Sequence, residues 1–304
     1  MKIGYWSERG PNKGSIRLRH ELICDTLRNN GYDARLDYKR GTDRDLIFYR
    51  TGKHEPEGFD LRARYGDTPI VYDVCNYPGD YIFKKKRSSV IAQCDAVSVC
   101  SESMRKLVSA QLAEFGITKP VVLLPDAAEY PRGVPELNVD KKLKIGWFGN
   151  AIGFTGNWAE VKRDLSDKYK VEFSFLCNRP VYRDGNFIKF DHTKQEQFIK
   201  SQDIILIICD WNSQDAFHKS HNRLIDAAYC GTPVVASPLP AYMIHKEYHS
   251  IGTNYAELID NAITNKEDTL ARLRAGQDFI EKNYSPLVVG ESFIRDLKEI
   301  GVLK

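Results

Sequence analysis

The sequence predicts an α/β protein made of two tandem, doubly wound domains, each built on a parallel β-sheet. First, a chain of 304 residues is longer than one hydrophobic core usually supports. Second, short apolar runs alternate with helical patterns through both halves. Third, residues 129–142 mix prolines, a glycine and charges without apolar periodicity, which is typical of a linker. We therefore expect domains at 1–135 and 136–285, and a last helix within 286–304 that packs on either domain, including back on the N-terminal one.

The N-terminal half begins with a strand, KIGYW, and a helix, IRLRHELICDTLRNNG, that stops at Gly31. Strand and helix patterns then continue to alternate, and this alternation predicts parallel strands. The expected strands are YDARLDY, DLIFYR, PIVYDVC, DAVSVCS and KPVVLLPD, with helices near 80–93 and 102–115.

The C-terminal half repeats this organisation. Its run DIILIICD is continuously apolar, as a central parallel strand should be. The other expected strands are KIGWFGN, KVEFSFLCN, NFIKF and TPVVASP, with helices near 157–168, 193–201 and 219–230.

Composition excludes few functions. A net charge of +3 is too small to indicate a polyanionic partner. The basic run KKKR at 84–87 suits anionic lipid or nucleic acid, but also an ordinary solvated helix face. No window approaches about 18 apolar residues, so we expect no transmembrane segment, at most peripheral membrane contact, and a cytoplasmic protein. The seven cysteines, without metal-ligand spacing, are read as buried thiols, and no metal site is predicted.

The stretch KSHNRLID places four polar side chains on one helix face, because successive residues turn by about 100°. This helix follows the expected strand DIILIICD at its carboxyl end, where open α/β sheets bind ligands. Asp226 could accept hydrogen bonds from a ribose, while Lys219 or Arg223 and the amides from Ser220 to Asn222 meet phosphates. A solvated helix face explains the same spacing equally well.

The run DAAYCGTPVVAS resembles the carboxyl-terminal signature of GT-B glycosyltransferases of the retaining group 1 type. KIGWFGN resembles the start of that family's donor domain, and the similarity is most specific between 203 and 237. The resemblance implies two Rossmann-like domains with an interdomain cleft and ribose binding by Asp226. It also implies a UDP- or GDP-type nucleotide sugar as co-substrate, with no separate cofactor and no metal.

The chain departs from that family at charged positions. His218 stands where the family's sugar-facing acid would be, eight residues before Asp226. Asn150 and Thr155 stand where the family usually carries Arg and Lys on the donor's diphosphate. Lys219, Arg223 or Arg179 are candidates to replace these charges. His218 is either a hydrogen-bond donor to the sugar or leaving group, or an exposed loop histidine.

Two glycine-containing turns are further candidates for phosphate contact. Gly149 and Asn150 lie in GWFGNAIGFTGNW, where backbone could approach a phosphate or simply form a flexible loop. Gly14 lies in ERGPNKGS, which the resemblance assigns to the donor's sugar and phosphates; a Rossmann dinucleotide site is its rival. Asp73, at the end of PIVYDVC, is either an acceptor-orienting group in the cleft or a cap or turn residue.

These observations predict a metal-independent glycosyltransferase that moves a sugar from a nucleotide-diphosphate sugar to an acceptor hydroxyl. Retention of anomeric configuration is implied by the resemblance alone. A nucleotide-sugar epimerase or phosphorylase, and a non-catalytic nucleotide-sugar-binding protein, are the alternatives. The acceptor stays open among glycans, lipid-linked glycans, proteins and modified nucleobases, because fold does not determine it.

Overall fold

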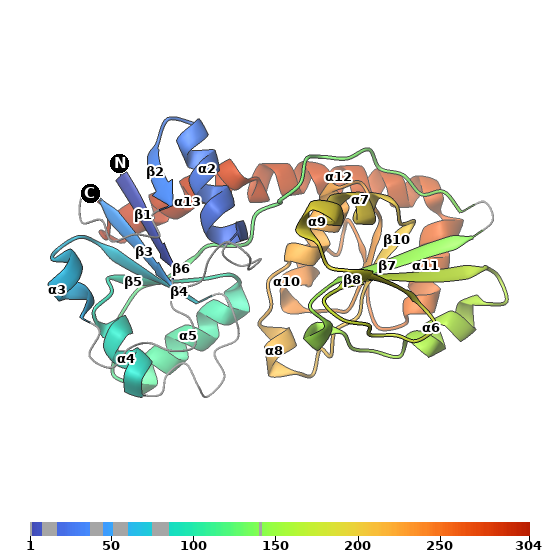
Figure 1. Ribbon diagram of the computed structural model, residues 1–304, viewed down its shortest axis with the longest axis horizontal. Helices are drawn as coiled ribbons and strands as arrows, with labels where there is room; N and C mark the ends of the chain where they lie inside the picture. Colours follow the sequence, from blue (N-terminus) through green and yellow to red (C-terminus); the bar gives the residue numbers. More distant parts are fainter. Residues whose placement is uncertain (1, 8–16, 37–44, 51–59, 75–84, 140–141) are drawn as a thin grey trace. The chain divides into compact units, whose positions relative to one another are not determined.

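A computed structural model describes residues 2–7, 17–36, 45–50, 60–74, 85–139 and 142–304 (Figure 1). The chain forms two compact units, which we describe separately. Unit 1 comprises Met1–Glu129, His218–Ser220 and Asn283–Lys304, and unit 2 comprises Tyr130–Phe217 and His221–Lys282.

Unit 1 contains a six-stranded sheet in the order β2-β1-β3-β4-β5-β6, and every pairing is parallel. Its strands are β1 (Lys2–Ser7), β2 (Asp33–Leu36), β3 (Leu46–Arg50), β4 (Ile70–Val74), β5 (Ala96–Val99) and β6 (Val121–Leu123). Its helices are the π-helical turn η1 (Arg17–Glu21), α2 (Leu22–Asn29), α3 (Leu61–Tyr65), α4 (Lys85–Ala92), α5 (Glu102–Glu114) and α13 (Pro286–Glu299).

Helices cover both faces of this sheet. Ile23 and Leu27 of α2 and Phe293 of α13 share one apolar cluster with alternate strand residues. The other cluster joins the opposite strand residues to α3, α4 and α5. Side chains of a strand alternate between faces, so fully apolar strands are what two covered faces require.

Unit 2 contains a second parallel sheet in the order β12-β11-β10-β7-β8-β9. Its strands are β7 (Leu143–Gly149), β8 (Val171–Cys177), β9 (Asn186–Lys189), β10 (Ile204–Ile207), β11 (Val234–Ala236) and β12 (Ser250–Ile251). Its helices are η3 (Ala151–Gly153), α6 (Trp158–Leu165), η4 (His192–Lys194), α7 (Gln195–Lys200), α8 (Gln214–Phe217), α9 (Asn222–Tyr229), α10 (Pro240–Met243), α11 (Tyr255–Thr264) and α12 (Lys266–Tyr284), whose last residues lie in unit 1.

The sheet of unit 2 winds outward in both directions from β7 and β10. One face packs against α6 and α11 around Trp158 and Ile259, whereas α9 contacts β10 and β11. In such a sheet the strand order reverses between the two central strands, and ligands bind at the carboxyl edge there. The topology therefore points to the loops after β7 and β10.

The predicted fold class is confirmed, since both halves are doubly wound and parallel. The polar helix begins at Asn222, three residues later than expected. The preceding residues belong to unit 1, where Ser101 Oγ donates to the His218 carbonyl (3.3 Å) and Ser220 Oγ donates to Asp126. The last helix, α13, packs on α2 within unit 1.

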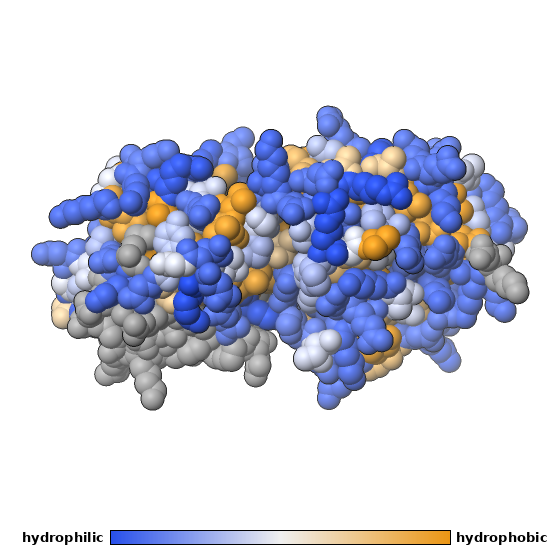
Figure 2. Space-filling model, turned by 90° about the horizontal axis from the view of Figure 1, so that it is seen from above, coloured by the Kyte–Doolittle hydropathy of each residue, from blue (hydrophilic) through white to orange (hydrophobic). Residues whose placement is uncertain are grey.

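The cysteines within the described residues are buried, as expected, and Cys75 lies outside them. The side chains of the basic run 84–87 also lie outside the described part. On the face shown in Figure 2, hydrophilic residues predominate and apolar residues form small separate patches. Among the described helices, none combines the length and apolarity needed to cross a membrane.

Gly156, in the loop after β7, gives a test of this packing. Its φ of +92° disfavours other residues, and a Cβ there would lie 2.2 Å from Ile208 Cγ2. We expect Gly156→Ala to lower the free energy of unfolding by roughly 1–3 kcal/mol from overpacking, in addition to backbone strain. Urea denaturation measures this, with Gly31→Ala as the control because Gly31 has a φ of +89° but open space. Equal losses in the two variants would show that the Ile208 contact is unimportant.

Candidate functional site

The candidate site lies at the carboxyl edge of the unit 2 sheet, where β7 and β10 end. Gly149, the last residue of β7, has a φ of +143°, which residues with a side chain rarely adopt. The next turn is fixed by Asn150, whose Oδ1 accepts from Ile152 N (3.1 Å), and by Asn178, whose Oδ1 accepts from Ala151 N (2.8 Å). The loop after β7 is thus held by its own cap and by the end of β8.

Helix α9 starts beside this edge, and its apolar side chains face the sheet as expected. Leu224 and Ile225 are buried, and Asn222 and Arg223 are partly exposed. Asp226 differs from the expected polar face, because none of its surface is exposed. Its Oδ2 accepts a hydrogen bond from Asn222 Nδ2 (3.2 Å), the kind of partner a buried carboxylate requires. Asp226 is therefore closed to solvent in this structure.

Arg223 is the cation that α9 presents at this edge. Its guanidinium carbon lies 5.6 Å from the centre of the Trp147 ring, a cation–π arrangement. Its Nη2 donates to Cys209 Sγ (3.4 Å), just beyond β10, and it also hydrogen-bonds with the Tyr242 hydroxyl of α10. A Cβ at Gly149 would lie 3.6 Å from Arg223 Cδ, so the bare Gly149 backbone borders the guanidinium.

Burial alone would lower the pKa of Arg223, but Tyr242 and Cys209 outweigh it and the pKa is raised. Burial likewise raises the pKa of Tyr242, so its hydroxyl stays neutral. Among the described residues, the groups that act most strongly on the Arg223 charge are thus a phenol and a thiol. The sequence pattern identified Arg223, but Trp147, Cys209 and Tyr242 come from separate elements and carried no comparable signal.

His218, Lys219 and Ser220 lie in unit 1. His218 is buried, which contradicts the alternative of an exposed loop histidine. Burial lowers the pKa of its imidazole, so the ring is neutral at pH 7. Lys219 and Ser220 are partly exposed, and Ser220 is held by Asp126.

Asp73 was expected either to orient an acceptor in the cleft or to be a cap or turn residue, but it is buried inside a strand. It lies within β4, and its carboxylate forms a buried ion pair with Arg19 of η1 and accepts from Ser98 Oγ (2.9 Å). Burial alone would raise the pKa of Asp73, but Arg19 and His20 outweigh it and hold the pKa well below its usual range. Asp73 therefore has a structural role. The sequence signal for its buried partners was Arg19 and His20, two polar residues inside an apolar helical pattern.

The remaining predicted residues are scattered. Arg179 is exposed just after β8, at the same edge as Arg223. Gly14, with the rest of ERGPNKGS, lies outside the described residues. Within the described ranges, no group of three His, Cys, Asp or Glu side chains is arranged to hold a metal.

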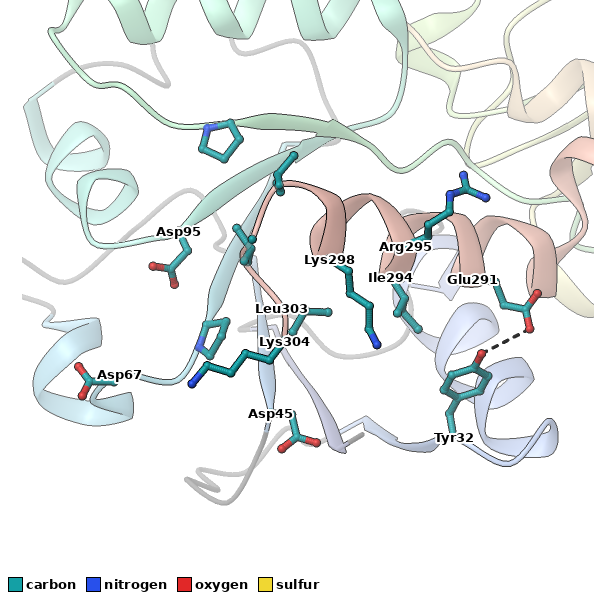
Figure 3. Close-up of a pocket in the computed structure, with 15 residues that line it drawn as sticks. Tyr32, Asp45, Asp67, Asp95, Glu291, Ile294, Arg295, Lys298, Leu303 and Lys304 are labelled. Carbon is teal, nitrogen blue, oxygen red and sulfur yellow. Dashed lines mark hydrogen bonds between the residues drawn. The ribbon is translucent and has the colours of Figure 1, made fainter.

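A large hollow of unit 1, about 1070 Å³, lies at the opposite, amino edge of its sheet (Figure 3). It is lined by α13 and by residues that precede β3 to β6. Three of its acidic groups have partners: Asp45 accepts from Lys2 N (2.6 Å), Asp95 from Ile70 N (2.7 Å), and Glu291 from the Tyr32 hydroxyl (3.4 Å). Parallel α/β sheets bind ligands at the other edge, so this hollow is not the candidate site.

Solved structures share this architecture over 98% of the chain. They include an alpha-glucosyltransferase in complex with UDP-glucose and DNA containing an abasic site (TM-score 0.67, 10% identity, 99% of that chain covered) and HepE of Anabaena in complex with UDP-glucose (0.66, 10%, 100%). A glycosyltransferase from Rickettsia africae is also similar (0.60, 12%, 98%). The chain therefore has the GT-B fold expected from the sequence resemblance. No family model and no curated protein matches the sequence.

Proposed function

We propose that this protein is a glycosyltransferase that uses a nucleotide-diphosphate sugar, of UDP or GDP type, bound at the carboxyl edge of the unit 2 sheet. The observation that carries the proposal is the convergence of the Gly149 turn, the start of α9 and Arg223 beside the β7–β10 switch point. GT-B structures with UDP-glucose bound support the choice of donor. Transfer to an acceptor hydroxyl is proposed to retain anomeric configuration.

In this proposal each residue of the site has a distinct role. Asp226 binds the ribose, and the backbone at Gly149 and Asn150 and the amides at Ser220 and Asn222 bind phosphate oxygens. The cations Lys219, Arg223 and Arg179 neutralise the diphosphate, so that no metal is required for its departure. His218, neutral at pH 7, hydrogen-bonds a sugar hydroxyl or a phosphate oxygen.

A nucleotide-sugar-binding protein without turnover is the second candidate. Asn150 and Thr155 bring no charge to the loop after β7, and Asp73 is committed to Arg19. Release of UDP from UDP-glucose with pooled glycan, lipid-linked, protein and modified-DNA acceptors separates the two candidates. Turnover that persists in EDTA supports the metal-independent mechanism, whereas loss in EDTA and recovery with Mn²⁺ contradicts it.

The donor site itself is tested with Asp226. We expect UDP at 100 times its dissociation constant to stabilise the protein by about 2.7 kcal/mol. Asp226→Asn keeps the size of the buried side chain but removes a charged acceptor, so UDP affinity should fall roughly 10- to 100-fold. Urea denaturation with and without UDP measures the stabilisation, and isothermal titration calorimetry measures the affinity, with Asp164→Asn on the exposed face of α6 as the control. Unchanged UDP affinity in a folded Asp226→Asn variant would refute ribose binding by Asp226.

A further inference from the structure

We propose that Arg223, supported by Trp147 and Tyr242, is the principal group that binds and neutralises the donor's diphosphate. This inference rests on the proposed function. It assigns to α9 a task for which the sequence left three candidates and for which the loop after β7, with Asn150 and Thr155, has no cation.

Among the described residues, the charge of Arg223 has no carboxylate partner. An arginine keeps its charge at every physiological pH, and packing that charge even partly out of water is unfavourable unless an anion compensates. The side chains in contact with its guanidinium within the described residues are those of Cys209, Tyr242 and Trp147, and none of them is a carboxylate. By contrast, the buried Arg19 of unit 1 has Asp73 and Asp126 beside it. A missing counter-ion at a ligand edge indicates an anionic ligand.

The Arg223 guanidinium also has the geometry that a phosphate requires. The guanidinium has five N–H donors in a planar fork, and Cys209 and Tyr242 use only part of them. The fork matches two oxygens of one phosphate, which a lysine ammonium does not. Because Gly149 has no side chain, a phosphate can approach both the guanidinium and the backbone of the loop after β7.

The guanidinium of Arg223 is fixed in position before any ligand binds. Trp147 is 1% exposed and supports the guanidinium from below, and Tyr242, also 1% exposed, bonds to it from α10. A fixed cation gives more stabilisation to developing charge than a mobile one, because no reorganisation is needed during the reaction. When the bond between the anomeric carbon and the diphosphate oxygen breaks, its electron pair stays on that oxygen, and Arg223 stabilises the added charge. The acceptor oxygen bonds to the anomeric carbon, and its proton passes to the departing phosphate.

The experiment compares ligands that differ only in phosphate. Binding of uridine, UMP and UDP is measured for the wild type and for Arg223→Gln, by calorimetry for UDP and by saturation-transfer NMR for the weak ligands. We expect Arg223→Gln to lower UDP affinity about 10- to 100-fold and to leave uridine affinity unchanged. Arg223→Lys should recover part of the UDP affinity, since charge is kept and the fork is lost. Arg163→Gln, on exposed α6, is the matched control and should bind like the wild type.

The outcomes separate this inference from the function on which it rests. If the wild type binds neither UDP nor GDP, the proposed function fails. The assignment of Arg223 is overturned if the wild type binds UDP and both Arg223 variants bind it as tightly as the wild type does. It is also overturned if the variants lose affinity for uridine and for UDP in equal proportion. A loss confined to phosphate-bearing ligands, together with a lower kcat at saturating UDP-glucose, supports it.

Discussion

Asp73→Ala is expected to lower the free energy of unfolding of unit 1 by about 3–5 kcal/mol, because it leaves the Arg19 guanidinium buried without its main counter-ion. Neither side chain of this pair is exposed to water. Arg19 also donates to the Leu124 carbonyl and lies 3.6 Å from Asp126, so the loss should fall short of that for a wholly isolated charge. Urea denaturation at pH 7 measures the change.

The double variant Arg19→Met/Asp73→Leu separates the ion pair from simple loss of packing. Replacing both charges with apolar groups of similar size is often neutral or stabilising, so the double variant should be more stable than Asp73→Ala. Asp25→Asn, at the exposed Arg28 pair, is the surface control and should cost less than about 1 kcal/mol. If the double variant proved no more stable than Asp73→Ala, the buried Arg19 charge would not account for the loss, and the structural role of the pair would be wrong.

The fold could be predicted from the sequence because its signals are local and repeated. Parallel strands covered on both faces are short apolar runs, such as DIILIICD, and glycines such as Gly31 mark helix ends. The start of α9 was placed three residues early. The residues just before it, His218 and Ser220, are held instead by Ser101 and Asp126, more than ninety residues away in the chain. No local pattern carries information about such distant partners.

The candidate site was only partly predictable. Helical spacing brought Asn222, Arg223 and Asp226 together, and the structure keeps them on one helix. Spacing does not report burial, so Asp226 was expected on an accessible helix face and Asp73 in the cleft or at a cap or turn, whereas both are buried. The platform under Arg223 combines β7, the end of β10 and α10, and depends on tertiary packing that no single segment encodes.

Acidification is expected to destabilise unit 2 strongly through a cluster of buried histidines, His221, His245 and His249. His221 Nδ1 lies 3.0 Å from His245 Nε2, and Phe279 of α12 packs edge-on against the His245 ring. Burial, with His221 and His249 nearby, lowers the pKa of His245 to about 2. Burial, with Arg272 nearby, lowers the pKa of His249 to about 3.

The free energy of unfolding should fall on acidification because the unfolded chain binds more protons than the folded chain. An unfolded histidine titrates near 6.5, so below that pH the unfolded chain binds protons at His245 and His249 that the folded chain does not. The contribution of the two histidines to the free energy of unfolding is therefore fully present above pH 6.5. It falls as pH decreases toward 3, by roughly 1.4 kcal/mol per pH unit for each of the two residues. Between pH 6.5 and 4.5 the loss is roughly 5 kcal/mol, a window in which most carboxylates are still ionised. Because His221 directly precedes α9, the first turn of α9 should unfold as the cluster becomes protonated.

Urea denaturation of the whole chain between pH 7.5 and 4.5 measures this slope, with tryptophan fluorescence as the probe because Trp147 and Trp158 are buried in unit 2. His249→Gln should remove about half of the slope while costing some stability at pH 7.5, since glutamine does not ionise. His192→Gln, on the partly exposed turn η4, should leave the slope unchanged. A His249→Gln variant with the wild-type slope would mean that His249 is protonated in the folded protein, and would remove the histidine cluster as the cause of acid sensitivity.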